Sequence, residues 1–132
     1  MYVFNLQGKI IKKSETIKRP NNVDIAYGLQ IDGVLTDIAV TTERETNKIR
    51  IFSLPDLKPL DNGGIPVFEG ELERDPMGIA IYTRPSDKAV FAIVGRKSGP
   101  SGSYLWQYEL KGTSNAKVEA TDLLHFITSD TL

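Results

Sequence analysis

Residues 21–24, Asn-Asn-Val-Asp, place two side-chain amides and a carboxylate directly before an apolar stretch. Calcium takes its ligands from carboxylate, amide and backbone carbonyl oxygens, and a turn at this point would supply all three kinds within four residues. Asn and Asp are also common in ordinary turns, because their side chains bond to the nearby backbone. The four residues therefore fit either a calcium loop or a simple turn into a strand, and their types alone favour the simple turn.

Arg44, in TTERET, and Lys97, in GRKSG, each follow directly on a predicted apolar strand. A guanidinium group binds phosphate through two parallel hydrogen bonds, and an ammonium group binds it as a point charge. The competing interpretation is a solvated surface, on which Arg44 pairs weakly with Glu43 or Glu45. Because side chains alternate along a strand, Arg96 is predicted to point away from Lys97.

The composition excludes several other kinds of site. The 132 residues include no cysteine and one histidine, His125, so thiolate metal sites, disulfides and histidine-based triads have little to build from. We expect His125 to be structural or solvent-facing. Sixteen basic residues nearly balance seventeen acidic ones, and the net charge of -1 predicts neither a nucleic-acid partner nor a membrane partner. No long apolar run is present, and the first 13 residues, MYVFNLQGKIIKK, lack the order of a signal peptide.

Alternation of apolar and polar residues with a period of two dominates the chain and predicts strands. Groups of Gly, Pro, Asn, Asp and Ser separate these stretches, as expected of turns. Residues 120–126, ATDLLHF, are ambiguous and are compatible with a helical turn. The sequence therefore predicts an all-β fold, either a sandwich, a barrel or a propeller. The predicted strands fall at 2–6, 23–29, 36–41, 48–52, 78–84, 89–94 and 104–110.

An internal repeat favours the propeller. Residues 36–54 and 89–110 share one layout, a strand, a polar turn and a second strand, and Arg44 and Lys97 fall at equivalent places. A repeat of roughly 50 residues fits a four-stranded antiparallel propeller blade, so the chain would hold two to three blades. We accordingly expect residues 1–132 to form one partial propeller domain, incomplete at both ends. The open sheet edges of such a domain favour self-association, and we expect oligomers or poor solubility.

The stretch NNVDIAY (21–27), followed by TDIAV (36–40), Arg44 and IRIF (49–52), resembles the β-propeller phytases. The resemblance extends over about residues 1–125. The family signature has the form N-N-[FVI]-D-[VIL]-R-[YF], and this chain keeps every position except the arginine, which is Ala26. Membership would imply a six-bladed propeller about twice as long as this chain. It would also imply calcium-dependent hydrolysis of phytate, which is myo-inositol hexakisphosphate.

The resemblance also assigns roles to residues. It implies that the backbone carbonyl of Val23 binds calcium, that Asn22 and Asp24 shape the calcium loop, and that Arg44 and Lys97 bind phosphate as the catalytic pair. A methionine, Met77, stands where Bacillus-type members have an active-site tyrosine. Other parts of the family site fall outside residues 1–132, so we expect the chain alone to be inactive. The family is usually extracellular or periplasmic.

Three functions remain open at this point. The first is a calcium-dependent phosphomonoesterase acting on phytate, which the retained Arg44 and Lys97 favour. The second is a non-catalytic propeller of phytase ancestry that binds a partner or an anion, which Met77 and Ala26 favour. The third is a propeller hydrolase acting on sugars or lactones, which would need metal-binding carboxylates facing the channel but neither Arg44 nor Lys97.

Overall fold

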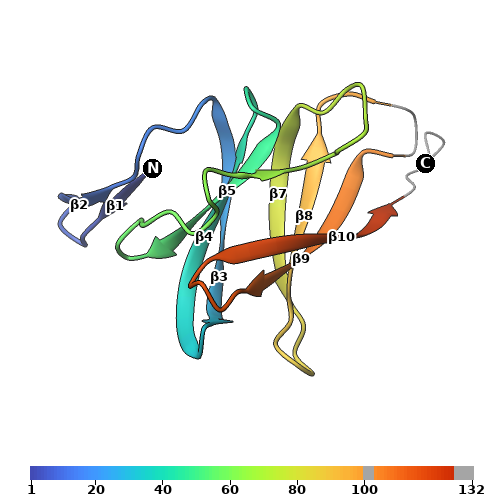
Figure 1. The fold of residues 1–132 in the computed structure, drawn as a ribbon. Helices are drawn as coiled ribbons and strands as arrows, with labels where there is room; N and C mark the ends of the chain where they lie inside the picture. Colours follow the sequence, from blue (N-terminus) through green and yellow to red (C-terminus); the bar gives the residue numbers. More distant parts are fainter. Residues whose placement is uncertain (100–102, 127–132) are drawn as a thin grey trace.

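Strands make up most of the chain, as the alternating pattern predicts. The computed structural model describes residues 1–99 and 103–126, and within these ranges it contains ten strands and no helix (Figure 1). The strands are β1 (Tyr2–Phe4), β2 (Ile10–Lys13), β3 (Pro20–Ile31), β4 (Val34–Glu43), β5 (Lys48–Leu54), β6 (Ile65–Pro66), β7 (Pro76–Thr83), β8 (Val90–Arg96), β9 (Leu105–Gly112) and β10 (Val118–Phe126).

The strands form two antiparallel four-stranded sheets with the same layout. The first has the order β3-β4-β5-β6 and the second the order β7-β8-β9-β10, and β1 and β2 form a separate two-stranded hairpin. The hairpins β4–β5 and β8–β9 are the two segments that the internal repeat paired in the sequence. The all-β prediction is confirmed, and each sheet is consistent with a propeller blade in an open arrangement.

The first strands of the two sheets, β3 and β7, lie in contact along the junction between the sheets (Figure 1). Side chains from facing surfaces fill this junction. Ile38, Val40 and Ile51 of the first sheet and Val94 and Trp106 of the second are all buried there. Burying a large apolar side chain stabilises a fold by about 1.5–3 kcal/mol, so this shared core holds the two sheets together. The prediction that Trp106 is a packing aromatic is confirmed.

The helical turn suggested for residues 120–126 is wrong, because these residues lie in β10, which pairs antiparallel with β9. Two adjacent leucines, Leu123 and Leu124, interrupt the period of two in the sequence. The strand accommodates them with a register shift between Asp122 and Leu124, so that Asp122 lies opposite Tyr108 and Leu124 opposite Gln107. An extra residue in one strand of a pair is a β-bulge, and it obscures the strand pattern when only the sequence is read.

Candidate functional site

The two asparagines lie in a bulged strand, where the sequence had predicted a turn. β3 begins at Pro20, and its pairing with β4 shifts register between Pro20 and Val23. The hydroxyl of Thr41, on β4, donates to the carbonyl of Asn22 at 2.6 Å. This bond gives the Asn22 carbonyl a hydrogen-bond partner within the bulge. Both asparagine side chains are exposed and hydrogen-bond to one another at 3.1 Å. The bulge therefore presents amide groups to solvent from a fixed backbone.

The carboxylate of Asp24 bonds to backbone on both sheets. One oxygen accepts the N–H of Ile25 at 2.8 Å, and the other accepts the N–H of Ile81, on β7, at 2.8 Å. Alternation in β3 makes this possible, because Val23 and Ile25 are exposed while Asp24 and Ala26 face the second sheet. The structure thus gives Asp24 a role in joining the sheets, and a role in shaping a calcium loop stays a prediction.

A second polar bond crosses the same junction. The fully buried hydroxyl of Thr42, near the end of β4, donates to the carbonyl of Met77 at 2.8 Å. Met77 is the second residue of β7. We call the end of the two sheets where β3 and β7 begin, and β4 and β8 end, the entry rim. The Thr42–Met77 bond fixes how the two blades meet there.

Arg44 follows the last residue of β4, and Lys97 follows the last residue of β8, so both belong to the entry rim. The backbone N–H of Lys97 donates to the carbonyl of Asp75 at 2.9 Å, which places Lys97 beside the residue preceding β7. Arg44 lies two residues after Thr42, whose hydroxyl bonds to Met77 from the first sheet, so Arg44 approaches the start of β7 from the side opposite Lys97. The structure therefore brings the segments that carry Arg44 and Lys97 to opposite sides of the beginning of β7.

Within residues 1–99 and 103–126, Arg44 and Lys97 form no ion pair with a carboxylate. Arg44 is half-buried, and its Nε is buried without a hydrogen-bond partner in the described part of the chain. The Lys97 side chain is exposed. Both groups are thus available to an anion at the entry rim.

Arg96 points away from Lys97, as alternation predicted. Its guanidinium is buried and donates to the carbonyls of Ser103 at 3.0 Å and Glu73 at 2.9 Å, and it pairs with Glu71 at 3.1 Å. These bonds tie the segment before β7 to the end of β8. Arg96 therefore supports the backbone around Lys97.

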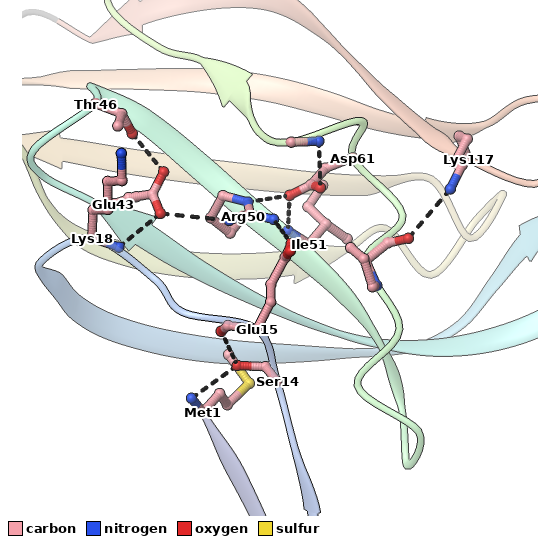
Figure 2. Close-up of polar contacts among 12 residues, drawn as sticks. Met1, Ser14, Glu15, Lys18, Glu43, Thr46, Arg50, Ile51, Asp61 and Lys117 are labelled. Atoms are coloured by element: carbon pink, nitrogen blue, oxygen red, sulfur yellow. Dashed lines mark hydrogen bonds and ion pairs between the residues drawn. The ribbon is translucent and has the colours of Figure 1, made fainter.

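A charged cluster, buried except for Glu15, lies beside the turn between β4 and β5 (Figure 2). Its centre is Arg50 on β5, which is 4% exposed. Arg50 pairs through Nε with Asp61 at 2.9 Å, through Nη1 with Glu43 at 3.5 Å, and through Nη2 with Glu15. Burial by itself lowers the pKa of Arg50, but its bonds to Asp61 and Glu15 outweigh burial and hold that pKa above the usual value.

Glu43 links this cluster to the turn and to the segment before β3. Its carboxylate accepts the hydroxyl of Thr46 at 2.5 Å and the backbone N–H of Lys18 at 2.9 Å (Figure 2). Burial raises the pKa of Glu43, but these hydrogen bonds and the charge of Arg50 outweigh burial and hold that pKa below its usual value. The cluster therefore fixes both the Arg44 turn and the entry into β3.

The residues present supply only part of a calcium site. Among the described residues, no three His, Cys, Asp or Glu side chains gather to hold a metal. The exposed amides of Asn21 and Asn22 offer oxygens at the bulge, and β3 is the edge strand of its sheet, so some of its backbone carbonyls have no neighbouring strand in that sheet. The Val23 carbonyl as a calcium ligand stays a prediction. Calcium takes six to eight oxygen ligands, so this stretch fits one wall of a site whose remaining ligands come from elsewhere.

His125 lies near the end of β10, which is the outermost strand of the second sheet, at the same end of that sheet as Lys97 but separated from β8 by β9. Its ring stacks on Trp106 with 3.5 Å between ring centroids, and its Nε2 lies 3.0 Å from the carboxylate of Asp122. The prediction of a structural or solvent-facing histidine agrees with this packing, because the ring stacks on Trp106 and the side chain is 45% exposed.

Comparison with known proteins adds an independent finding. A family model described as Phytase matches residues 1–131. A search of curated proteins gave no match. In the part of the chain that the structure describes, no helix is long and apolar enough to cross a membrane.

Proposed function

Because the chain belongs to the phytase family, we propose that it is part of a calcium-dependent phosphomonoesterase that hydrolyses phytate, with Arg44 and Lys97 binding phosphate. The observation that carries the proposal is the position of these two residues. They flank the start of β7 at the entry rim, beside the amide-rich bulge, and neither forms an ion pair with an acid among the described residues. We also propose that the protein is extracellular or periplasmic, which is the usual location of the family.

In this mechanism the protein binds and orients a phosphate and needs no nucleophile of its own. The Arg44 guanidinium takes two phosphate oxygens, and the Lys97 ammonium approaches as a point charge from the other side of β7. Both cations stabilise the negative charge that grows on the oxygens as water attacks phosphorus. The carbonyl of Val23 and the amide of Asn22 would hold calcium, which when bound neutralises phosphate charge and activates water. Asp24 fixes the bulge through its two backbone hydrogen bonds.

A non-catalytic binding module is the second candidate, and Ala26 and Met77 favour it. Ala26 is 2% exposed and packs in the core between the two sheets. The arginine of the family signature would not fit this position without displacing its neighbours, because protein cores are closely packed. Met77 brings a thioether where Bacillus-type members of the family have an active-site tyrosine, so the hydroxyl of that tyrosine is missing here.

Phosphate release from phytate distinguishes the two candidates. The protein expressed from the full reading frame that contains residues 1–132 is assayed with calcium and then with a chelator. Release that depends on calcium supports the enzyme. A folded protein that binds phytate but releases no phosphate at any calcium concentration supports the binding module. A folded protein that neither binds nor cleaves phytate contradicts both.

A further inference from the structure

The carboxylate next to Arg44 in the sequence, that of Glu43, lies on the face of the first sheet that points away from the second sheet. The hydroxyl of Thr42 bonds to Met77 on the second sheet, so Glu43, the next residue of β4, points to the opposite face. Arg50 lies on that face and pairs with Glu43 at 3.5 Å. In the part of the chain that the structure describes, Arg44 forms no ion pair with a carboxylate. Arg50 therefore takes up the charge of Glu43 and leaves the Arg44 guanidinium available to an anion.

The Glu43 carboxylate also fixes the backbone on both sides of Arg44. One oxygen accepts the hydroxyl of Thr46, two residues beyond Arg44, at 2.5 Å, and the other accepts the backbone N–H of Lys18 at 2.9 Å. Lys18 leads to Arg19, whose carbonyl accepts the backbone N–H of Arg44 at 3.1 Å. Glu43 thus holds the far end of the turn that carries Arg44, and it holds the segment to which the Arg44 backbone is bonded.

The segment before β3 needs such an anchor. The φ of Arg19 is 57°, in the left-handed region that a residue with a side chain seldom adopts. Such a conformation persists only where the surrounding structure holds it. Both backbone groups of Lys18 supply that hold, because its N–H donates to Glu43 and its carbonyl accepts the N–H of Glu45 at 3.4 Å. Without the Glu43 carboxylate, we expect this segment to relax and to shift Arg44 with it.

We infer that Glu43 is a positioning residue, which orients Arg44 for phosphate binding through its hydrogen bonds to Thr46 and Lys18. The inference rests on the proposed phosphate role of Arg44. A guanidinium group binds phosphate through two parallel hydrogen bonds, so the geometry of the backbone that carries it matters for affinity. Holding that backbone in place before the ligand arrives lowers the cost of ordering it on binding. Glu43 itself contacts no ligand in this role.

The test measures the affinity of the protein from the full reading frame for phytate by calorimetric titration. Glu43→Ala removes both hydrogen bonds, and we expect it to weaken binding about tenfold, the loss typical of one charge-assisted contact. Glu43→Gln is expected to recover most of the affinity, because its carbonyl can accept from Lys18 and its amide can donate to the Thr46 hydroxyl. Thr46→Val cuts only the bond to the turn and should weaken binding about threefold.

A double substitution shows whether Glu43 acts through Arg44. If it does, Glu43→Ala adds no further loss of affinity to a protein that already carries Arg44→Ala, because coupled residues are not additive. Asp61→Ala is the matched control, since it removes another buried carboxylate that pairs with Arg50 and whose remaining bonds go to Ile51 and Gly63. It should lower the melting temperature but leave phytate affinity within about twofold.

The outcomes separate this inference from the proposed function. If Arg44→Ala weakens phytate binding and Glu43→Ala does not, the role of Glu43 is overturned and the function stands. Additive losses in the double variant, or no recovery in Glu43→Gln, also overturn it, because they indicate a general structural role. If Arg44→Ala leaves phytate binding unchanged, the proposed role of Arg44 fails and this inference fails with it. Each titration is made below the melting temperature of the variant, and if Glu43→Ala does not fold, unchanged affinity in Thr46→Val overturns the inference.

Discussion

The carboxylate of Asp24 on β3 accepts the backbone N–H of Ile81 on β7 at 2.8 Å, and so joins the two blades through a single side chain. The Thr42–Met77 bond at 2.8 Å adds a second link a short way along the same junction. Since Arg44 follows β4 and Lys97 is bonded beside the start of β7, these links set the relative position of the two proposed phosphate-binding residues. The geometry of the site therefore depends on the junction between the blades.

We predict that Asp24→Ala lowers the free energy of unfolding by about 1–3 kcal/mol, because it leaves the N–H of Ile81 without its partner at the junction. Urea denaturation measures the loss. Asp56→Ala, which removes a carboxylate exposed in the turn after β5, is the control and should change little. The loss should persist in chelator, because the bond to Ile81 needs no metal. A loss seen only in calcium would instead assign Asp24 mainly to the metal.

Replacing Arg50 with methionine is predicted to cost about 3–5 kcal/mol of unfolding free energy, because it leaves the buried Asp61 and Glu43 carboxylates without their cation. Chemical denaturation followed by fluorescence of the single tryptophan reports the change. Arg84→Met removes an exposed arginine that pairs with Asp87 and should have a far smaller effect. Equal effects of the two substitutions would show that the buried cluster is not a special source of stability.

Glu43 makes the fold sensitive to acid. Its pKa is lower in the folded protein than the usual glutamate value of 4.5, so its contribution to stability is complete above about pH 4.5 and is lost as the pH falls through the folded-state pKa. Glu43→Gln should lower stability at pH 7 and flatten the decline between pH 5 and pH 3. Urea midpoints of both proteins across this range test the prediction. Parallel curves would mean that Glu43 does not contribute to the acid sensitivity.

Tyr108 makes the stability of the fold depend on pH in the opposite sense, at alkaline pH. Burial raises its pKa above the usual value near 10, and its hydroxyl oxygen accepts the backbone N–H of Phe68 at 2.9 Å. Its contribution to stability is complete below about pH 10 and is lost as the pH rises through the folded-state pKa. In an ultraviolet titration, one of the five tyrosines should ionise late. Tyr108→Phe should abolish that late step; its persistence in the variant would refute the assignment.

Local patterns predicted the fold better than they predicted the contacts. The first three strands of each blade follow from alternation within a few residues, and the repeat of Arg44 at Lys97 follows from the shared layout of β4–β5 and β8–β9. The last strand of each blade was missed, because β6 is only two residues long and β10 contains a bulge. The Arg50 cluster could not be predicted, because Glu15, Glu43 and Asp61 come together only when three segments pack. The bulge at Asn22 was missed for a related reason. The Asn22 carbonyl accepts its hydrogen bond from Thr41, which lies on β4 and is distant in the sequence.

Self-association remains a prediction from the sequence. Val23 and Ile25 are 55% and 41% exposed on the face of β3 that points away from the second blade. Ile25 pairs with Ala39 across β3 and β4, and Ile81 pairs with Ala92 at the equivalent place across β7 and β8. The Ile81–Ala92 pair packs against the core, whereas Ile25 is exposed. Light scattering of residues 1–132 tests the expectation, and a clean monomer with a cooperative melt would contradict it.

The rate of phosphate release from phytate in the variants Arg44→Ala and Lys97→Ala tests the central claim most directly. The protein from the full reading frame is assayed with calcium, with Lys12→Ala as the matched control. If both cations stabilise the charge that develops on phosphate, each variant should lose about 10²–10³-fold in kcat/KM while melting at the wild-type temperature. Wild-type rates in both variants would contradict the assignment of Arg44 and Lys97 as the phosphate-binding pair.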